Sequence, residues 1–139
     1  MPSIREVMTS DPTALRATAS VVEAAEAMRR SDIGDVIVLD ETDQVCGIVT
    51  DRDIVVRAVA EQKDPSDVRL GDICSRDPVT LTSQDEVGDA VKLMTENAIR
   101  RLPIVDDGVP VGIVSLGDLA VSLDPESGLS DISSAAPNE

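Results

Sequence analysis

The chain has 139 residues, 42% of them hydrophobic, which suits one compact domain with an ordinary core. It contains no Phe, Trp or Tyr, so any wall that contacts a ligand must be aliphatic. Its 27 acidic and 12 basic residues give a formal net charge of -15, which repels nucleic acid and anionic membranes alike. These features predict a globular protein without nucleic-acid or membrane partners.

The chain has no histidine and only two cysteines. This composition predicts no catalytic residues and no metal site, because histidine is the commonest general base and a frequent zinc ligand. We expect Cys46 and Cys74 to be small buried residues. No apolar run is long enough to cross a membrane, and the first residues lack the apolar stretch of a secretion signal, so a cytoplasmic location is expected.

The first half of the chain predicts an extended piece, a helix, two strands and a second helix. The pattern Ser20-x-x-Glu23 is a capping box that would begin the first helix. The acidic turn at residues 40–43 joins the strands and lacks the glycine and spacing of an EF-hand loop, so we expect a solvated turn. The extended piece is expected at residues 13–15, and the first helix begins at residue 21. The two strands are expected at 36–39 and 45–49, and the second helix at 50–60.

The second half repeats this order. Placing Asp11 over Asp77 aligns the extended piece, the helix and the first strand at a constant offset of 66 residues. A one-residue gap in the turn then brings Gly47 over Gly112. The repeated extended piece is expected at residues 79–81, and its helix begins at residue 87. The strands are expected at 102–105 and 111–114, and the last helix at 115–123. We therefore predict a first motif at 3–60, a linker at 61–68, a second motif at 69–123 and a disordered tail at 124–139.

The second helix of the first motif is apolar around most of its circumference at residues 54–60. That is more apolar surface than one intramolecular face can cover. Two explanations stay open, a homodimer interface and packing against the linker.

Residues 33–40, 47–54, 99–106 and 112–119 resemble the CBS motif, which is named for cystathionine beta-synthase. The resemblance covers residues 3–123. It implies an α+β fold of the stand-alone bacterial type, with tandem β-α-β-β-α motifs packed sheet to sheet about a pseudo-two-fold axis. It also implies a homodimer and two clefts that take AMP, ADP, ATP or S-adenosylmethionine as a regulatory ligand, with no required cofactor. The sequence does not identify the client protein.

The resemblance assigns ligand roles to two pairs of residues, Thr50 with Asp53 and Ser115 with Asp118. In the family, the hydroxyl of such a pair serves phosphate and the carboxylate serves the ribose. The chemistry is sound, because a carboxylate can accept from both ribose hydroxyls and the start of a helix suits an anion. The same spacing is also that of a plain capping box, so capping is the competing explanation.

Positive charge for a phosphate is supplied unevenly. Arg100 and Arg101 stand where family members often bind phosphate, whereas the first repeat has Gly34 and Asp35 there. Arg52 could supply a further charge or balance its acidic neighbours. Surface ion pairs of small value are the alternative for the two arginines of the second repeat. We therefore expect two clefts that are not equivalent.

The base is expected to contact the extended piece and the first strand of each motif. Ile37 stands where the family usually has proline, so the first motif is the less typical one. The candidates are Thr80, Leu102, Pro103 and Ile104 in the second motif, and Ala14, Val36, Ile37 and Val38 in the first.

The chain has three candidate functions. A non-catalytic regulatory module that binds an adenosine-type ligand leads, because the Ser/Thr-x-x-Asp pattern recurs at matched places. An interaction or dimerisation protein with empty clefts is the alternative. An enzyme is disfavoured, since the chain has neither histidine nor a glycine-rich phosphate loop.

Overall fold

The computed structural model describes residues 2–123, and the tail predicted at residues 124–139 lies outside them. The chain divides into two compact units. The first-repeat unit is Pro12–Pro78 with Asp107–Pro110, and the second-repeat unit comprises, among the described residues, 2–11, Val79–Asp106 and 111–123. The N-terminal segment thus groups with the second repeat. The motif limits predicted above describe the repeat in the sequence and not these compact units.

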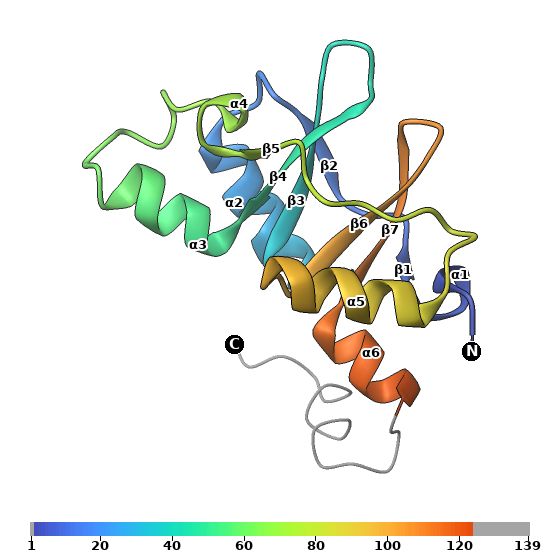
Figure 1. The fold of residues 1–139 in the computed structure, drawn as a ribbon. Helices are drawn as coiled ribbons and strands as arrows, with labels where there is room; N and C mark the ends of the chain where they lie inside the picture. The colour runs from blue at the N-terminus through green and yellow to red at the C-terminus, as the bar shows by residue number, and fades with distance from the viewer. Residues whose placement is uncertain (1, 124–139) are drawn as a thin grey trace. The chain divides into compact units, whose positions relative to one another are not determined.

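The first-repeat unit contains a four-stranded sheet in the order β2-β3-β4-β5 (Figure 1). β2 runs parallel to β3, and the other neighbouring strands are antiparallel. Buried aliphatic side chains from α2, β3, β4 and α4 form its hydrophobic core. The strands are β2 (Ala14–Arg16), β3 (Asp35–Leu39), β4 (Val45–Thr50) and β5 (Ser75–Arg76). The helices are α2 (Val21–Ser31), α3 (Asp51–Ile54), the π-helix η1 (Val55–Val59) and α4 (Leu70–Ile73).

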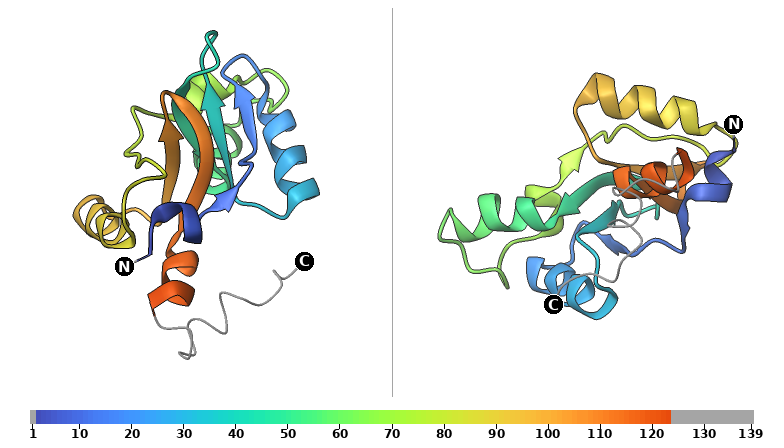
Figure 2. Two further views of the ribbon diagram at one scale, coloured as in Figure 1. Left: turned by 90° about the vertical axis from the view of Figure 1, so that its right-hand side faces the viewer. Right: turned by 90° about the horizontal axis from the view of Figure 1, so that it is seen from below.

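The second-repeat unit contains a three-stranded sheet in the order β1-β7-β6. Helix α1 (Ile4–Val7) contacts both α5 (Val87–Asn97) and α6 (Leu116–Leu123). The right-hand view of Figure 2 shows these three helices. Its separate core draws on α1, α5, β6, β7 and α6. The strands are β1 (Thr9–Ser10), β6 (Arg101–Asp106) and β7 (Val109–Ser115), and the helices are α1 (Ile4–Val7), α5 (Val87–Asn97) and α6 (Leu116–Leu123).

The mixed sheets and helices confirm the predicted α+β class. Helices α2 and α5 confirm the two helices predicted from apolar spacing, and each has 11 residues. The capping box at the start of α2 is also confirmed. The Glu23 N–H donates to Ser20 Oγ at 3.2 Å, and the Ser20 N–H donates to Glu23 Oε2 at 3.1 Å. Two otherwise unpaired donors are thereby satisfied at the helix start.

The two repeats differ at the strand edge next to β3 and β6. β2 pairs with β3 along its whole length, and the Ile37 N–H donates to the Thr13 carbonyl at 3.0 Å. The residue aligned with Ile37 is Pro103, which has no N–H to donate. The extended piece predicted for the second repeat therefore forms only a parallel bridge between Leu81 and Ile104. This edge of the second repeat has less backbone pairing than its counterpart.

A glycine lies where a short strand pairs with the second strand of each hairpin. A Cβ atom at Gly47 of β4 would lie 2.8 Å from both the Cys74 sulfur and the Ser75 carbonyl oxygen. Gly112 of β7 has the same relation to β1. The two glycines are aligned in the repeat, so the same close approach is built twice.

The helix predicted over residues 50–60 consists of α3 followed by η1. In the π-helical part, the Ala60 N–H donates to the Val55 carbonyl at 2.8 Å. Val55, Val56 and Val59 are 57%, 46% and 57% exposed. The linker therefore does not cover these three side chains, which we call the valine surface.

Candidate functional site

Thr50 and Asp53 form a closed hydrogen-bonded turn at the start of α3. The Asp53 N–H donates to Thr50 Oγ1 at 3.1 Å, and the Thr50 N–H donates to Asp53 Oδ2 at 2.9 Å. Both residues are half-buried. The capping box that the sequence offered as an explanation is thus present. A ligand role for the two residues stays a prediction.

Ser115 and Asp118 form the same turn at the start of α6. The Asp118 N–H donates to Ser115 Oγ at 3.1 Å, and the Ser115 N–H donates to Asp118 Oδ2 at 2.8 Å. The two repeats therefore present one hydroxyl and one carboxylate in the same local geometry. In each turn, carboxylate Oδ2 accepts from the backbone and Oδ1 takes no part in that hydrogen bond.

The second carboxylate oxygen has different surroundings in the two turns, a difference that the sequence prediction missed. Asp53 Oδ1 lies 3.9 Å from Nε of Arg57, whose Nη1 donates to the Ile73 carbonyl at 2.9 Å. Ser122 stands four residues after Asp118, where the first turn has arginine. Within residues 2–123, no cation forms an ion pair with Asp118. The Asp118 carboxylate therefore makes fewer charged contacts than the Asp53 carboxylate.

Arg100 is placed next to the second turn by its backbone. The Leu116 N–H donates to the Arg100 carbonyl at 2.8 Å, just as the Asp51 N–H donates to the Gly34 carbonyl at 2.9 Å. The backbone of Arg100 therefore lies beside the first turn of α6, and its side chain is exposed. The start of a helix favours the binding of an anion. The first repeat has no side chain at the matched place.

Two further arginines were predicted to bind ligand. Arg52 is exposed at the start of α3, and its N–H donates to the Asp51 carboxylate at 2.9 Å. Arg101 is half-buried at the first position of β6. The second repeat therefore has two adjacent arginines ahead of its turn, whereas the first has one arginine within its turn.

Most of the predicted base-binding side chains are buried. Val36 and Val38 pack in the core of the first-repeat unit, and Leu102 and Ile104 pack in that of the second. Side chains alternate along a strand, so the intervening residues point to the opposite sheet face. Ile37 and Pro103 are these intervening residues and are also buried, while Ala14 is half-buried and Thr80 exposed.

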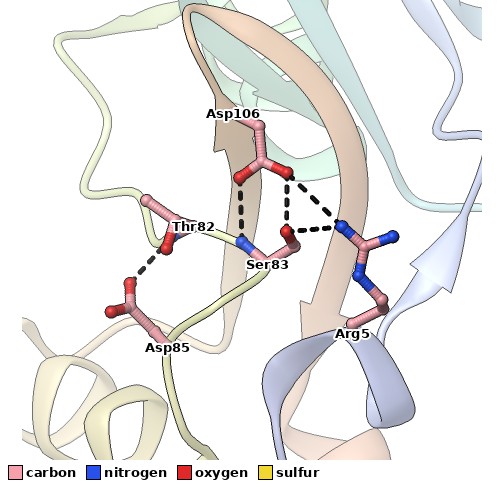
Figure 3. Close-up of polar contacts among 5 residues, drawn as sticks. All are labelled: Arg5, Thr82, Ser83, Asp85 and Asp106. Carbon is pink, nitrogen blue, oxygen red and sulfur yellow. Dashed lines mark hydrogen bonds and ion pairs between the residues drawn. The ribbon is translucent and has the colours of Figure 1, made fainter.

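The sequence prediction also missed a polar cluster made by Arg5, Ser83 and Asp106 in the second-repeat unit (Figure 3). Ser83 Oγ donates to Asp106 Oδ2 at 2.6 Å, although Ser83 is only 1% exposed. The Ser83 hydrogen bonds hold the pKa of the Asp106 carboxyl below its ordinary value, with a smaller contribution from the Arg5 charge. Aligning the repeats puts Ser83 over Ala17, a difference that could have drawn attention to it.

Neither cysteine is in a disulfide. Cys74 is buried as expected, whereas Cys46 is only half-buried. Burial raises the pKa of both thiols. Within the part of the chain that the structure describes, no group of three or more Cys, Asp or Glu could hold a metal ion. In the same residues, no helix has the length and apolar character needed to cross a membrane.

Curated proteins with similar sequences cover most of the chain. A Methanopyrus kandleri protein, MK0525, is 43% identical over 116 residues, which is 83% of this chain. The match covers only 57% of that relative. The Bacillus subtilis protein YlbB is 36% identical over 138 residues and is covered to 93% of its length, with 96% of this chain matched.

A solved structure shares the fold. The CBS domain pair of protein MJ0100, in complex with 5′-methylthioadenosine and S-adenosyl-L-methionine, superposes with a TM-score of 0.81 at 24% identity. The match covers 91% of this chain and 99% of that one. The family model of the CBS domain matches twice, at residues 4–59 and 70–125. The resemblance drawn from the motifs is thereby confirmed: the chain belongs to the CBS-domain family and carries two CBS motifs in tandem.

Proposed function

We propose that the chain is a non-catalytic regulatory module that binds an adenosine-type ligand at its Ser/Thr–Asp turns. The observation that carries this proposal is the recurrence of one hydrogen-bonded turn, with a hydroxyl and a carboxylate, at matched places in the two motifs. The ligands of the MJ0100 pair are adenosine compounds and agree with the proposed class. At 24% identity that likeness supports the fold and does not by itself support a ligand.

The second turn is proposed as the stronger site for a phosphate-bearing ligand. Asp118 would accept hydrogen bonds from the ribose hydroxyls through the oxygen that does not hold Ser115. Arg100 and the start of α6 would attract the phosphate, with Arg101 as a neighbouring charge. The Ser115 hydroxyl would donate a hydrogen bond to the phosphate.

The first turn is proposed as the weaker site for phosphate. Asp53 is already close to a cation, and Arg52 is the only arginine within the turn itself. Because Gly34 stands where the second repeat has Arg100, an adenosine compound without phosphate would suit this turn better. S-adenosylmethionine fits that description.

For the base, we propose contact with the strand edge beside Thr80 and with the backbone next to Pro103. The side chains of Leu102 and Ile104 are committed to the core, so these residues would offer only backbone groups. In the first motif, Ala14 on β2 is the counterpart, because the backbone of β3 at residues 36–38 is already paired with β2 and β4. The aliphatic surroundings would hold a base by packing rather than by aromatic stacking.

Calorimetric titration of the full chain with AMP, ADP, ATP and S-adenosylmethionine tests the proposal. We expect saturable binding of at least one compound, with one site per chain for the phosphate-bearing ligands. Ribose 5-phosphate and adenine serve as half-ligand controls. If none of the four compounds released heat or raised the melting temperature, the proposal of an adenosine ligand would be rejected.

The valine surface supports a second candidate, a homodimer that acts as an interaction module for a client protein. Val55, Val56 and Val59 are exposed together on η1, and burial of such a surface favours association. We expect Val55→Asp with Val59→Asp to lower the sedimentation coefficient to that of a monomer. Val109→Asp, at another exposed valine, is the control. An unchanged sedimentation coefficient in the double variant would refute a dimer through η1.

A further inference from the structure

The polar cluster of the second-repeat unit fastens the N-terminal helix to the loop that leads into α5 (Figure 3). Arg5 Nη2 donates to Ser83 Oγ at 3.0 Å and lies 4.0 Å from Asp106 Oδ2. Ser83 donates twice to Asp106, through Oγ at 2.6 Å and through its backbone N–H at 3.0 Å. The Ser83 hydroxyl thus both accepts and donates a hydrogen bond, and the Ser83 N–H donates another.

The first repeat keeps the backbone part of this contact and lacks the side-chain part. In the second repeat, the Arg5 N–H donates to the Ser83 carbonyl at 3.3 Å. In the first, the Gly71 N–H donates to the Ala17 carbonyl at 2.9 Å. The loop of the first repeat is also held by Arg69, whose Nη1 donates to the Thr18 carbonyl at 3.2 Å. The side-chain contacts among Arg5, Ser83 and Asp106 have no counterpart there and belong to the second repeat alone.

The hairpin turns explain why Asp106 is available for this contact. The aligned Asp40 is occupied by its own turn, where it accepts from Thr42 N and Oγ1 and from Gln44 N at 2.8, 2.6 and 3.1 Å. These bonds lower the pKa of Asp40, the Thr42 hydroxyl first. The second hairpin closes through Asp107–Gly108, both at positive φ, 52° and 81°. Such a two-residue turn needs no side-chain cap, which leaves Asp106 free to reach Ser83.

The cluster replaces backbone pairing that the second repeat has lost. In the first repeat, the Ala17 N–H donates to the Leu39 carbonyl at 2.8 Å and continues the pairing of β2 with β3. At the matched place, the Ser83 N–H turns instead to the side chain of Asp106. Pro103 removes another bond from this edge, so its backbone–backbone bonds to β6 are those of Leu81. The bonds of Ser83 to Asp106 thus add to the few backbone bonds of the edge that includes Thr80.

We propose that Arg5, Ser83 and Asp106 are positioning residues that fix the strand edge at Thr80 and Leu81 for contact with the base of an adenosine ligand. The proposal rests on the proposed function, since it assigns a role within that site. None of the three residues touches the ligand in this scheme. Their effect is to hold the edge in place before the ligand binds, so that binding need not order it.

A comparison of whole and half ligands tests the proposal in the full chain. Titrations followed by amide NMR would measure the affinity for AMP and for ribose 5-phosphate, which lacks the base. We expect Ser83→Ala and Arg5→Met to weaken AMP binding about 5-fold, the loss of roughly one hydrogen bond, and to leave ribose 5-phosphate within about 2-fold. Arg5→Lys should recover part of the AMP affinity, because it restores the charge.

Asp40→Asn is the matched control, since it removes the aligned carboxylate of the first repeat. A second measurement is hydrogen exchange of the Leu81 and Val105 amides without ligand, which should quicken in Ser83→Ala and not in the control. Equal weakening of both ligands, or no weakening with unchanged exchange, would overturn the positioning role. Failure of the wild-type chain to bind any adenosine compound would instead defeat the proposed function itself.

Discussion

Replacing Asp118 by asparagine is expected to weaken AMP binding by about 10- to 100-fold, the cost of losing a charge-assisted hydrogen bond to the ribose. Asparagine keeps an oxygen that can accept from the Ser115 N–H, so the turn and α6 should persist. It removes the negative charge and one of the two acceptors. Calorimetric titration would measure the affinity, and the melting temperature would report whether the fold is intact.

Two variants make this result specific. Asp89→Asn removes the same charge from another capping position of the same unit, where Asp89 Oδ2 accepts from the Glu86 N–H at 2.9 Å. It should leave AMP affinity nearly unchanged. Asp53→Asn should cost less than Asp118→Asn, because Asp53 is already close to Arg57. A larger AMP loss in Asp53→Asn than in Asp118→Asn would reverse the assignment of the two turns.

Replacing Gly47 by alanine is expected to destabilise the chain by about 1–3 kcal/mol, the usual cost of overpacking a filled site. The added Cβ would lie 2.8 Å from both the Cys74 sulfur and the Ser75 carbonyl oxygen. A side chain could move aside, but the carbonyl belongs to the backbone of β5, so β5 itself must shift from β4. Urea unfolding would measure the loss of free energy.

The second repeat supplies the comparison for this prediction. A Cβ at Gly112 would lie 2.5 Å from Met8 Sδ and 3.0 Å from the Thr9 carbonyl oxygen. Because a methionine side chain adapts readily, Gly112→Ala should destabilise the chain less than Gly47→Ala. Adding Cys74→Ala to Gly47→Ala should restore only part of the loss, since the carbonyl contact remains. Wild-type stability in Gly47→Ala would contradict this explanation of the glycine.

Much of the fold could be predicted because its signals are local and occur twice. The apolar spacing of α2 and α5 and the alternation in the hairpin strands are properties of neighbouring residues. The capping turns of Thr50 and Ser115 are equally local, since hydroxyl and carboxylate are three residues apart. Repetition, at an offset of 66 residues that becomes 65 after the hairpin turn, then turned each weak signal into a stronger one.

The short elements could not be predicted in the same way. Helix α1 has four residues and β1 has two, too few to show a periodic pattern. Helix α1 depends on a distant partner, because the Ile4 N–H donates to the Asp85 carbonyl at 2.8 Å. The extended piece at 79–81 failed to become a strand for a similar reason, since its pairing requires an N–H that Pro103 lacks.

The sequence by itself determined the family, the α+β class and the pairs of residues that form the two turns. Only the tertiary structure decided that the Ile73 carbonyl holds the Arg57 side chain beside Asp53, and that Ser83 is bound by Asp106 and Arg5. The physical reason is range. Periodicity, capping and the Asp53–Arg57 spacing act over three or four residues, whereas the bonds of Arg57 to Ile73 and of Ser83 to Asp106 join segments that meet only in the folded chain.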